Sequence, residues 1–201
     1  MWSETLSYYL NTSYLEWLAV ITALAYVVLA ARENILCWPA ALLSTCLYTY
    51  IFYEYYLWMD SVLQVYYFVM AVYGWYCWKG RHLQQEAVSL NQLSWGFHAT
   101  TIVILSAVSV AVGYIMDNYT PTTFPYIDAA TTVFAVFATY LVTQKVIENW
   151  LYWVVIDIVS IYVYLEKGLA PTAALFIVYV FIAAYGYINW QSQYKRQAAI
   201  A

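Results

Sequence analysis

The chain has 201 residues, of which 65% are hydrophobic and only 9% are charged, with a formal net charge of −4 at pH 7. Soluble domains carry about 25% charged residues, so eleven acidic and seven basic side chains are too few to cover a water-soluble fold of this length. The composition therefore excludes a soluble globular protein, predicts an all-α integral membrane protein, and gives no reason to expect a nucleic-acid partner.

Seven apolar stretches follow one another along the chain, and each is close to the roughly 20 residues that a membrane-spanning helix needs. The seven stretches are predicted at about 15–31, 38–53, 58–78, 95–114, 126–143, 150–164 and 170–190. Pro39 stands in the first turn of the second stretch, where its missing N–H costs nothing. Polar linkers at 84–92 and 117–125 separate the fourth stretch from its neighbours.

The basic residues are distributed unevenly between the loops. They prefer the cytoplasmic side of a membrane, and an outside amino terminus places six of the seven inside. These six are Arg32, Lys79, Arg81, Lys145, Lys195 and Arg196. Only Lys167 would then lie outside, so we expect an outside amino terminus and a cytoplasmic carboxyl terminus.

Two phrases recur in the same order and indicate an internal duplication. E-N-x-L-x-W occurs at 33–38 and again at 148–153, which is 115 residues later. Y-G-x-x-x-W occurs at 73–78 and again at 185–190.

The duplication predicts three parts: a first three-helix repeat at 1–82, a linker helix at 83–120 and a second three-helix repeat at 121–201. Because three is odd, a single linker helix lets both repeats cross the membrane in the same direction. This is a 3+1+3 parallel repeat of the kind found in SWEET-type transporters, which hold the substrate near the bilayer midplane between the halves.

One carboxylate lies deep inside a predicted span. Ionisable groups in a bilayer are costly and commonly functional, and Asp157 lies about two turns inside the sixth stretch. On a helix it shares a face with Trp150 and Trp153, within an arc of about 60°. This face suits a planar cationic ring, because cation–π contacts contribute on the order of 0.5–2 kcal/mol each. Gln64 on the third stretch offers a further polar group.

These residues also have simpler interpretations. Asp157 could form a hydrogen bond between helices, and the tryptophans could fill gaps between them. Glu16, Asp60 and Asp128 lie near span ends, where contact with water explains them. His98 needs no special role. The three cysteines, without a CxxC motif or a nearby histidine, predict neither a metal site nor a disulfide.

At these residues the chain resembles the PnuC family of bacterial vitamin transporters. The segments that carry the resemblance are Leu63-Gln64-Val65-Tyr66-Tyr67, Tyr73-Gly74-Trp75-Tyr76-Cys77-Trp78, Asp128, and Glu148-Asn149-Trp150-Leu151-Tyr152-Trp153 with Asp157. The last segment is similar to the family's W-x-x-W-x-x-x-N/D signature. The resemblance implies a 3+1+3 helix fold in the bacterial inner (cytoplasmic) membrane. It also implies facilitated diffusion without ion or ATP coupling, followed by phosphorylation of the arriving vitamin by a cytoplasmic kinase.

Matched residue by residue, the resemblance also implies a set of substrate contacts. They are Gln64, Trp150, Trp153, Asp157, Asn189, Trp38 and Tyr67. The first repeat keeps Trp38 but has Ile35 and Leu42 where a full signature would place Trp and Asn or Asp, which predicts an asymmetric pocket.

Several substrates and functions stay open. Family members are associated with nicotinamide riboside, thiamine and riboflavin, and the first two carry a cationic heteroaromatic ring. We place nicotinamide riboside first, because it is the commonest assignment in the family, and thiamine second. The expected partners are the vitamin, the bilayer and further copies of the chain, with no cofactor or metal. An integral membrane enzyme is the alternative from another class, but the sequence has no GxxxxGK[ST], HExxH or serine motif.

Overall fold

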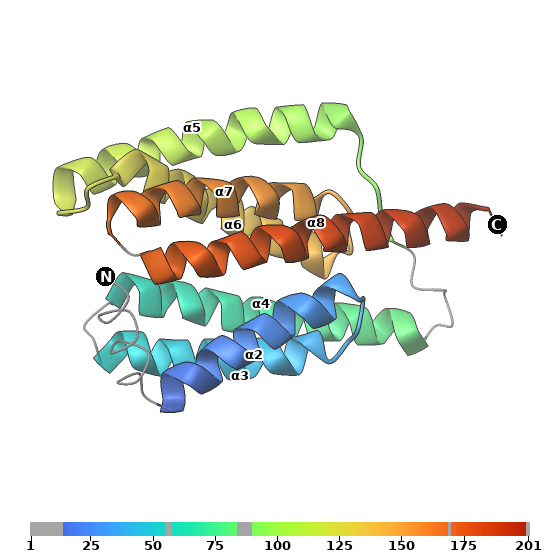
Figure 1. The fold of residues 1–201 in the computed structure, drawn as a ribbon. Coiled ribbons are helices and arrows are strands. Elements are labelled where there is room, and N and C mark those ends of the chain that lie inside the picture. The colour runs from blue at the N-terminus through green and yellow to red at the C-terminus, as the bar shows by residue number, and fades with distance from the viewer. Residues whose placement is uncertain (1–13, 55–57, 84–89, 169, 200–201) are drawn as a thin grey trace. The chain divides into compact units, whose positions relative to one another are not determined.

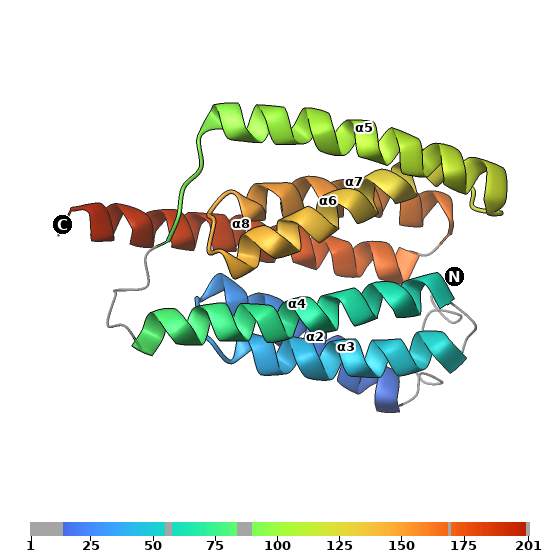
Figure 2. The same cartoon turned by 180° about the vertical axis from the view of Figure 1, so that it is seen from behind.

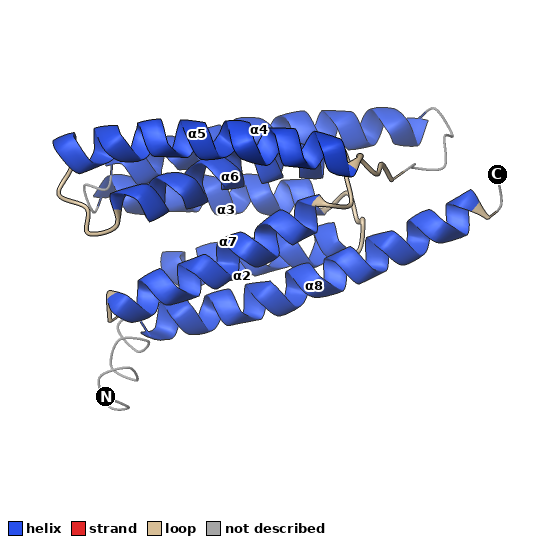
Figure 3. Cartoon of the chain, turned by 90° about the horizontal axis from the view of Figure 1, so that it is seen from above, coloured by secondary structure: helices blue, strands red, loops and turns tan. Residues whose placement is uncertain are grey.

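The computed structural model describes residues 14–54, 58–83, 90–168 and 170–199, and this part of the chain is all-α (Figure 1, Figure 3). The helices in chain order are α2 (Tyr14–Ala31), α3 (Cys37–Glu54), α4 (Trp58–Leu83), α5 (Trp95–Tyr119), α6 (Pro125–Thr143), α7 (Asn149–Glu166) and α8 (Ala170–Ala198). Helices α4, α5 and α8 continue past their predicted ends. The apolar stretch marks only the part of a helix that lies in hydrocarbon, and polar residues continue these helices beyond it.

Four of the helices are long and apolar enough to cross a membrane. They are α2, α5, α6 and the part of α8 at Thr172–Gln197. Seven spans therefore remain a prediction, although the all-α fold class is confirmed. The other three helices, α3, α4 and α7, are rich in tyrosine, tryptophan and hydroxyl side chains, which lower their mean hydropathy.

The chain forms two compact units, Met1–Val88 and Ser89–Ala201. In the first unit α3 packs against both α2 and α4. In the second unit α5 packs against α6, α6 against α7, and α7 against α8. Both views show α5 running alongside α6 (Figure 1, Figure 2). The helix predicted as a linker at 83–120 is thus α5, and its role between two repeats stays a prediction.

The turns α2–α3 and α6–α7 share a backbone conformation at positions 112 residues apart. Glu33 and Lys145 have φ angles of 54° and 55°, in the left-handed region that non-glycine residues seldom adopt. The Glu33 N–H donates to the Ala30 carbonyl at 2.9 Å, and the Lys145 N–H donates to the Val142 carbonyl at 3.0 Å. Each turn therefore reverses the chain by the same geometry.

In the first unit Trp38 joins α3 to α4. Its indole is 1% exposed and lies edge-on to Trp78, with the ring centroids 5.2 Å apart and the planes at 87°. The indole also covers Gly74, where an added Cβ would overlap the ring. The recurring Y-G-x-x-x-W phrase thus supplies the glycine that admits the ring and the tryptophan that it contacts.

The second unit repeats this contact between α7 and α8. Trp150 is 2% exposed, lies edge-on to Trp190 at 5.4 Å and 89°, and covers Gly186. An added Cβ at Gly186 would stand 2.7 Å from the Trp150 ring. Trp150 is therefore the structural counterpart of Trp38, at the same spacing of 112 residues.

This packing corrects the register inferred from E-N-x-L-x-W. That phrase, at a spacing of 115, pairs Trp38 with Trp153, which is displaced by almost one helical turn. At a spacing of 112 the positions that match Trp153 and Asp157 are Ala41 and Thr45. The departure of the first half from the signature therefore falls at these two residues rather than at Ile35 and Leu42.

Candidate functional site

Asp157 lies on α7 and is 4% exposed. Among the residues that the structure describes, no side chain or backbone group forms a hydrogen bond or an ion pair with it. The interhelical hydrogen bond that could have explained Asp157 is thus not made within the described part of the chain. A buried carboxylate is costly unless it is paired, so this group can gain much from a ligand that carries positive charge.

The two tryptophans on this stretch of α7 have different neighbours. Trp153 is only partly buried and packs against Ala135, Ala138 and Ile156, where α6 meets α7. Trp150 instead faces α8, where its ring is enclosed and its Nε1–H has no hydrogen-bond partner among the described residues. The packing of Trp150 supports a structural role, whereas Trp153 keeps part of its ring accessible.

The remaining predicted contacts lie in both units, and each is described within its own unit. Gln64 and Tyr67 are half-buried on α4, one turn apart, and Asn189 is half-buried on α8. Trp38 is enclosed by its packing against α4. Gln64 forms no hydrogen bond with another described residue.

Asp128 forms an ion pair near the start of α6. Its Oδ2 accepts a hydrogen bond from the Thr122 hydroxyl at 2.6 Å and lies 3.5 Å from the Lys167 Nζ. The Lys167 Nζ also lies 5.9 Å from the centre of the Phe124 ring. Asp128 is therefore a paired carboxylate at a helix end, unlike Asp157, in keeping with its interpretation as a residue of a span end.

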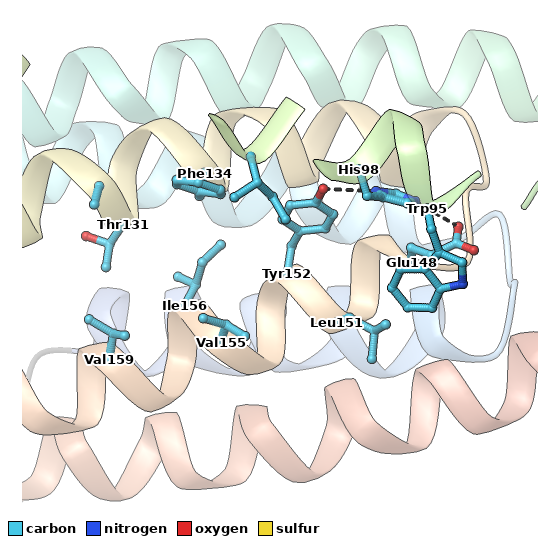
Figure 4. A pocket seen from close by; sticks show the side chains of 12 residues that line it. Trp95, His98, Thr131, Phe134, Glu148, Leu151, Tyr152, Val155, Ile156 and Val159 are labelled. Carbon is cyan, nitrogen blue, oxygen red and sulfur yellow. Dashed lines mark hydrogen bonds and ion pairs between the residues drawn. The ribbon is translucent and has the colours of Figure 1, made fainter. Parts of the chain in front are cut away.

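His98, to which no sequence pattern assigned a role, joins α5 to α7. Its Nδ1 lies 2.9 Å from the Tyr152 hydroxyl, and its Nε2 lies 3.7 Å from Glu148 Oε2 (Figure 4). The Leu93 N–H donates to the same oxygen at 3.4 Å. Glu148 and Tyr152 stand four residues apart, which places them on one helical face. That spacing was visible in the sequence, but their contact with His98 was not.

The segment before α5 covers the α6–α7 turn. Asn91 forms three hydrogen bonds with that turn: its N–H donates to Lys145 O at 2.9 Å, its carbonyl accepts from the Ile147 N–H at 2.9 Å, and its side-chain amide donates to Gln144 O at 2.7 Å. Ser94 then caps α5 by accepting from the Phe97 N–H. Together these contacts position the start of α5 beside the start of α7.

A pocket of about 380 Å³ lies between α5, α6 and α7. Its walls include Ile102 from α5, Phe134 from α6 and Val155 from α7, and Figure 4 shows the side chains around it. None of the predicted substrate contacts lines it. The buried carboxylate of Asp157 and this apolar pocket are therefore separate features of the second unit.

Comparison with known proteins gives a consistent result along the chain. A family model described as "Nicotinamide mononucleotide transporter" matches residues 13–192. The nicotinamide riboside transporter PnuC of Escherichia coli (strain K12) is 26% identical over 218 residues, which cover 95% of this chain and 90% of that protein. The riboflavin/roseoflavin transporter RibM of Streptomyces davaonensis is 24% identical over 181 residues, 89% of this chain and 84% of that protein.

One solved structure shares the fold. The crystal structure of the vitamin B3 transporter PnuC matches with a TM-score of 0.70 and 22% sequence identity, over 96% of this chain and 87% of that chain. This structure shows the shared fold, and the match to the family model over residues 13–192 confirms the resemblance inferred from the sequence segments.

Proposed function

This chain belongs to the nicotinamide mononucleotide transporter family, and we propose that it carries a cationic heteroaromatic vitamin or vitamin precursor into the bacterial cell. It is a multi-pass vitamin transporter of the membrane. Nicotinamide riboside is the first candidate, since three relatives at 25–26% identity are named as its transporters. Uptake proceeds by facilitated diffusion, and a cytoplasmic kinase traps the vitamin. An enzymatic function is set aside, because the named relatives are transporters.

The observation that carries this proposal is the buried carboxylate of Asp157, which has no hydrogen-bond or ion-pair partner among the described residues. A positively charged ring beside it would supply the missing partner, and the attraction between opposite charges is strong where water is excluded. Trp153 stacks on the ring from the same stretch of α7, with part of its indole accessible. Gln64 and Asn189 supply hydrogen bonds to the rest of the substrate.

Trp150, Trp38 and Tyr67 complete the set of contacts that the family resemblance implies. In this proposal the two tryptophans act mainly by holding α7 to α8 and α3 to α4, as their edge-on contacts with Trp190 and Trp78 support. Their role toward the substrate is then indirect, because each one fixes the helix that presents the contact residues.

The proposed architecture is a 3+1+3 parallel repeat of seven spans, with the amino terminus outside. Three features support the repeat at a spacing of 112 residues: the matching turns at Glu33 and Lys145, the two glycine–tryptophan contacts, and the matching starts of α3 at Cys37 and α7 at Asn149. The distribution of basic residues supports the orientation.

The test is the affinity for nicotinamide riboside of the purified full-length protein, measured by isothermal titration calorimetry. Asp157→Asn keeps the shape of the side chain and removes its charge, so the affinity should fall at least about tenfold, or ~1.4 kcal/mol. Asp128→Asn is the matched control, because it removes a carboxylate of the same unit that is already paired, and its affinity should stay within twofold. Equal affinities of wild type and Asp157→Asn would remove Asp157 from the site.

Thiamine is the second candidate, because its ring is also cationic and Asp157 suits it equally well. The relative named as a riboflavin/roseoflavin transporter makes riboflavin the third. Riboflavin carries a neutral ring, which needs no carboxylate. Titration of all three vitamins in the same experiment ranks them, and tight binding of riboflavin alone would overturn the cationic proposal.

A further inference from the structure

The apolar pocket between α5, α6 and α7 of the second unit has no part in the proposed vitamin site. Its walls are hydrocarbon side chains, such as Ile102, Phe134 and Val155. A vitamin carrying a charge and hydroxyl groups would leave those groups unpaired along such walls. The pocket therefore requires a different occupant, one that is apolar over most of its length.

The polar groups of the pocket gather at one end. Glu148, His98 and the Tyr152 hydroxyl form a connected cluster there, and Trp95 stands beside them with 79% of its surface exposed (Figure 4). The His98 Nε2 is buried without a hydrogen bond to any described residue. Elsewhere in the lining, the Thr131 hydroxyl is occupied by the carbonyls of its own helix.

The length of the pocket matches one leaflet of a bilayer. Its lining on α7 begins at Glu148 and continues to Val159, and this separation corresponds to about 16 Å at a helical rise of 1.5 Å per residue. Half of a hydrocarbon core of about 30 Å is ~15 Å. Tryptophan is enriched at membrane interfaces, which suits the exposed Trp95 at this end. In a membrane placed in this way, the pocket would run from the interface at Glu148 to the region of the bilayer midplane.

We propose that this pocket binds one acyl chain of a phospholipid from the cytoplasmic leaflet, with the headgroup ammonium of that lipid beside the Glu148 carboxylate. The proposal rests on the orientation proposed above, in which the Glu148 end lies on the cytoplasmic side. The negative charge favours a headgroup that carries an amine, such as phosphatidylethanolamine, over the anionic phosphatidylglycerol.

The geometry also distinguishes a lipid from a second copy of the chain. An α-helix with its side chains is 10–12 Å across, and a pocket of about 380 Å³ that extends along α7 from Leu151 to Val159 is too narrow for it. A helix of another copy could therefore cover this pocket but not enter it. An acyl chain is narrow and flexible, and it can follow the wall from Leu151 to Val159. The bound lipid would fill the wedge between α5 and α7 and stabilise the position of α5.

The experiment is native mass spectrometry of the full-length protein in detergent, offered phosphatidylethanolamine and phosphatidylglycerol in equal amounts. Wild type should retain one phosphatidylethanolamine per chain, at least threefold above phosphatidylglycerol. Ala130→Phe fills the pocket from α6 and should lose the lipid. Its matched control is Ala107→Phe on α5, which is exposed and outside the lining, and it should retain the lipid. Glu148→Gln should keep the acyl chain but lose the preference for the amine.

Three results would overturn the proposal: no lipid retained by wild type, a preference for phosphatidylglycerol or for neither lipid, or equal retention by Ala130→Phe and Ala107→Phe. A dissociated oligomer in Ala130→Phe, with no lipid on wild type, would assign the pocket to a second copy. If Ala130→Phe fails to fold, Val155→Phe replaces it. Ile158→Phe is then the control, because both residues are exposed on α7 and only Val155 lines the pocket.

Discussion

The α2–α3 and α6–α7 turns share a backbone conformation but differ in what covers them. Leu36 is 59% exposed, whereas Glu148, 112 residues later, is 6% exposed. The cover of the second turn comes from the segment around Asn91, which leads into α5. Equal backbone geometry is therefore compatible with unequal surroundings, and the acidic side chain stands at position 33 in the first turn but at position 148, next to α7, in the second.

The same contrast holds inside the helices. Thr45 on α3 bonds to the carbonyls of Ala41 and Leu42 on its own helix, whereas Asp157 at the matching position has no partner among the described residues. Ala41 likewise stands where the second unit has Trp153. The glycine–tryptophan contact gives both units the same helix packing. Asp157 in place of Thr45 and Trp153 in place of Ala41 put the carboxylate and the aromatic ring in the second unit only.

The largest loss of stability is expected from removing the tryptophan that packs between two helices in each unit. Trp38→Ala and Trp150→Ala should each lower the free energy of unfolding by about 3–5 kcal/mol, because each leaves a large cavity between two helices. Thermal unfolding in detergent measures this. If Trp150→Ala lost affinity for the vitamin but kept its stability, Trp150 would instead be a residue that contacts the substrate directly.

The glycines opposite these tryptophans give the next effect. Gly74→Ala and Gly186→Ala add a methyl group where the indole already stands, and such overpacking costs about 1–3 kcal/mol. Gly96→Ala is the control, since nothing lies within 4 Å of its added Cβ. Alanine is the better helix former by about 1 kcal/mol, so the control should not lose stability. Unchanged melting temperatures for all three variants would contradict the claim that the glycine–tryptophan contacts determine the helix packing of both units.

All seven predicted stretches fall within helices of the described residues, because a long apolar run bounded by polar residues favours a helix. It was wrong about the register of one repeated phrase. The letters of E-N-x-L-x-W match at 115, but α3 begins at Cys37 and α7 at Asn149, 112 residues apart. Matching letters alone do not show where a helix starts. The residues of Y-G-x-x-x-W form a packing contact in each unit, and this motif therefore has the correct spacing of 112 residues between the repeats.

The candidate site could be predicted only in part. The depth of Asp157 follows from its place in an apolar stretch, and its face follows from the helical period. Trp150 packs against Gly186 on α8, whereas Trp153 packs against the buried cluster where α6 meets α7. This difference depends on which helices pack against α7, and no local pattern encodes it. The contact of His98 with Glu148 joins residues about fifty positions apart and was invisible for the same reason.

Trp153 tests the functional side of the comparison. Trp153→Ala should weaken vitamin binding by about 1–3 kcal/mol if the indole stacks on the ring, by analogy with bases stacked on aromatic side chains. Its effect on unfolding should be smaller than that of Trp150→Ala, because its ring is only partly buried. Titration calorimetry and thermal unfolding on both variants separate the two roles. Equal losses of stability would show that both tryptophans serve packing.

The smallest effect comes from the cover of the second turn. Asn91→Ala removes the side-chain hydrogen bond to the Gln144 carbonyl and keeps both backbone bonds, so it should destabilise the second unit by about 0.5–1.5 kcal/mol. Asn34→Ala is the counterpart in the first turn. It removes a bond from the Leu36 N–H to an exposed side chain, which water can replace, and its effect should stay within about 0.5 kcal/mol.

Hydrogen exchange at Lys145 and Glu33 measures the two turns separately. Faster exchange at Lys145 in Asn91→Ala, without a change at Glu33, is expected, because the removed hydrogen bond lies at the second turn. If exchange became faster by the same factor at Lys145 in Asn91→Ala and at Glu33 in Asn34→Ala, the segment around Asn91 would not stabilise the second turn.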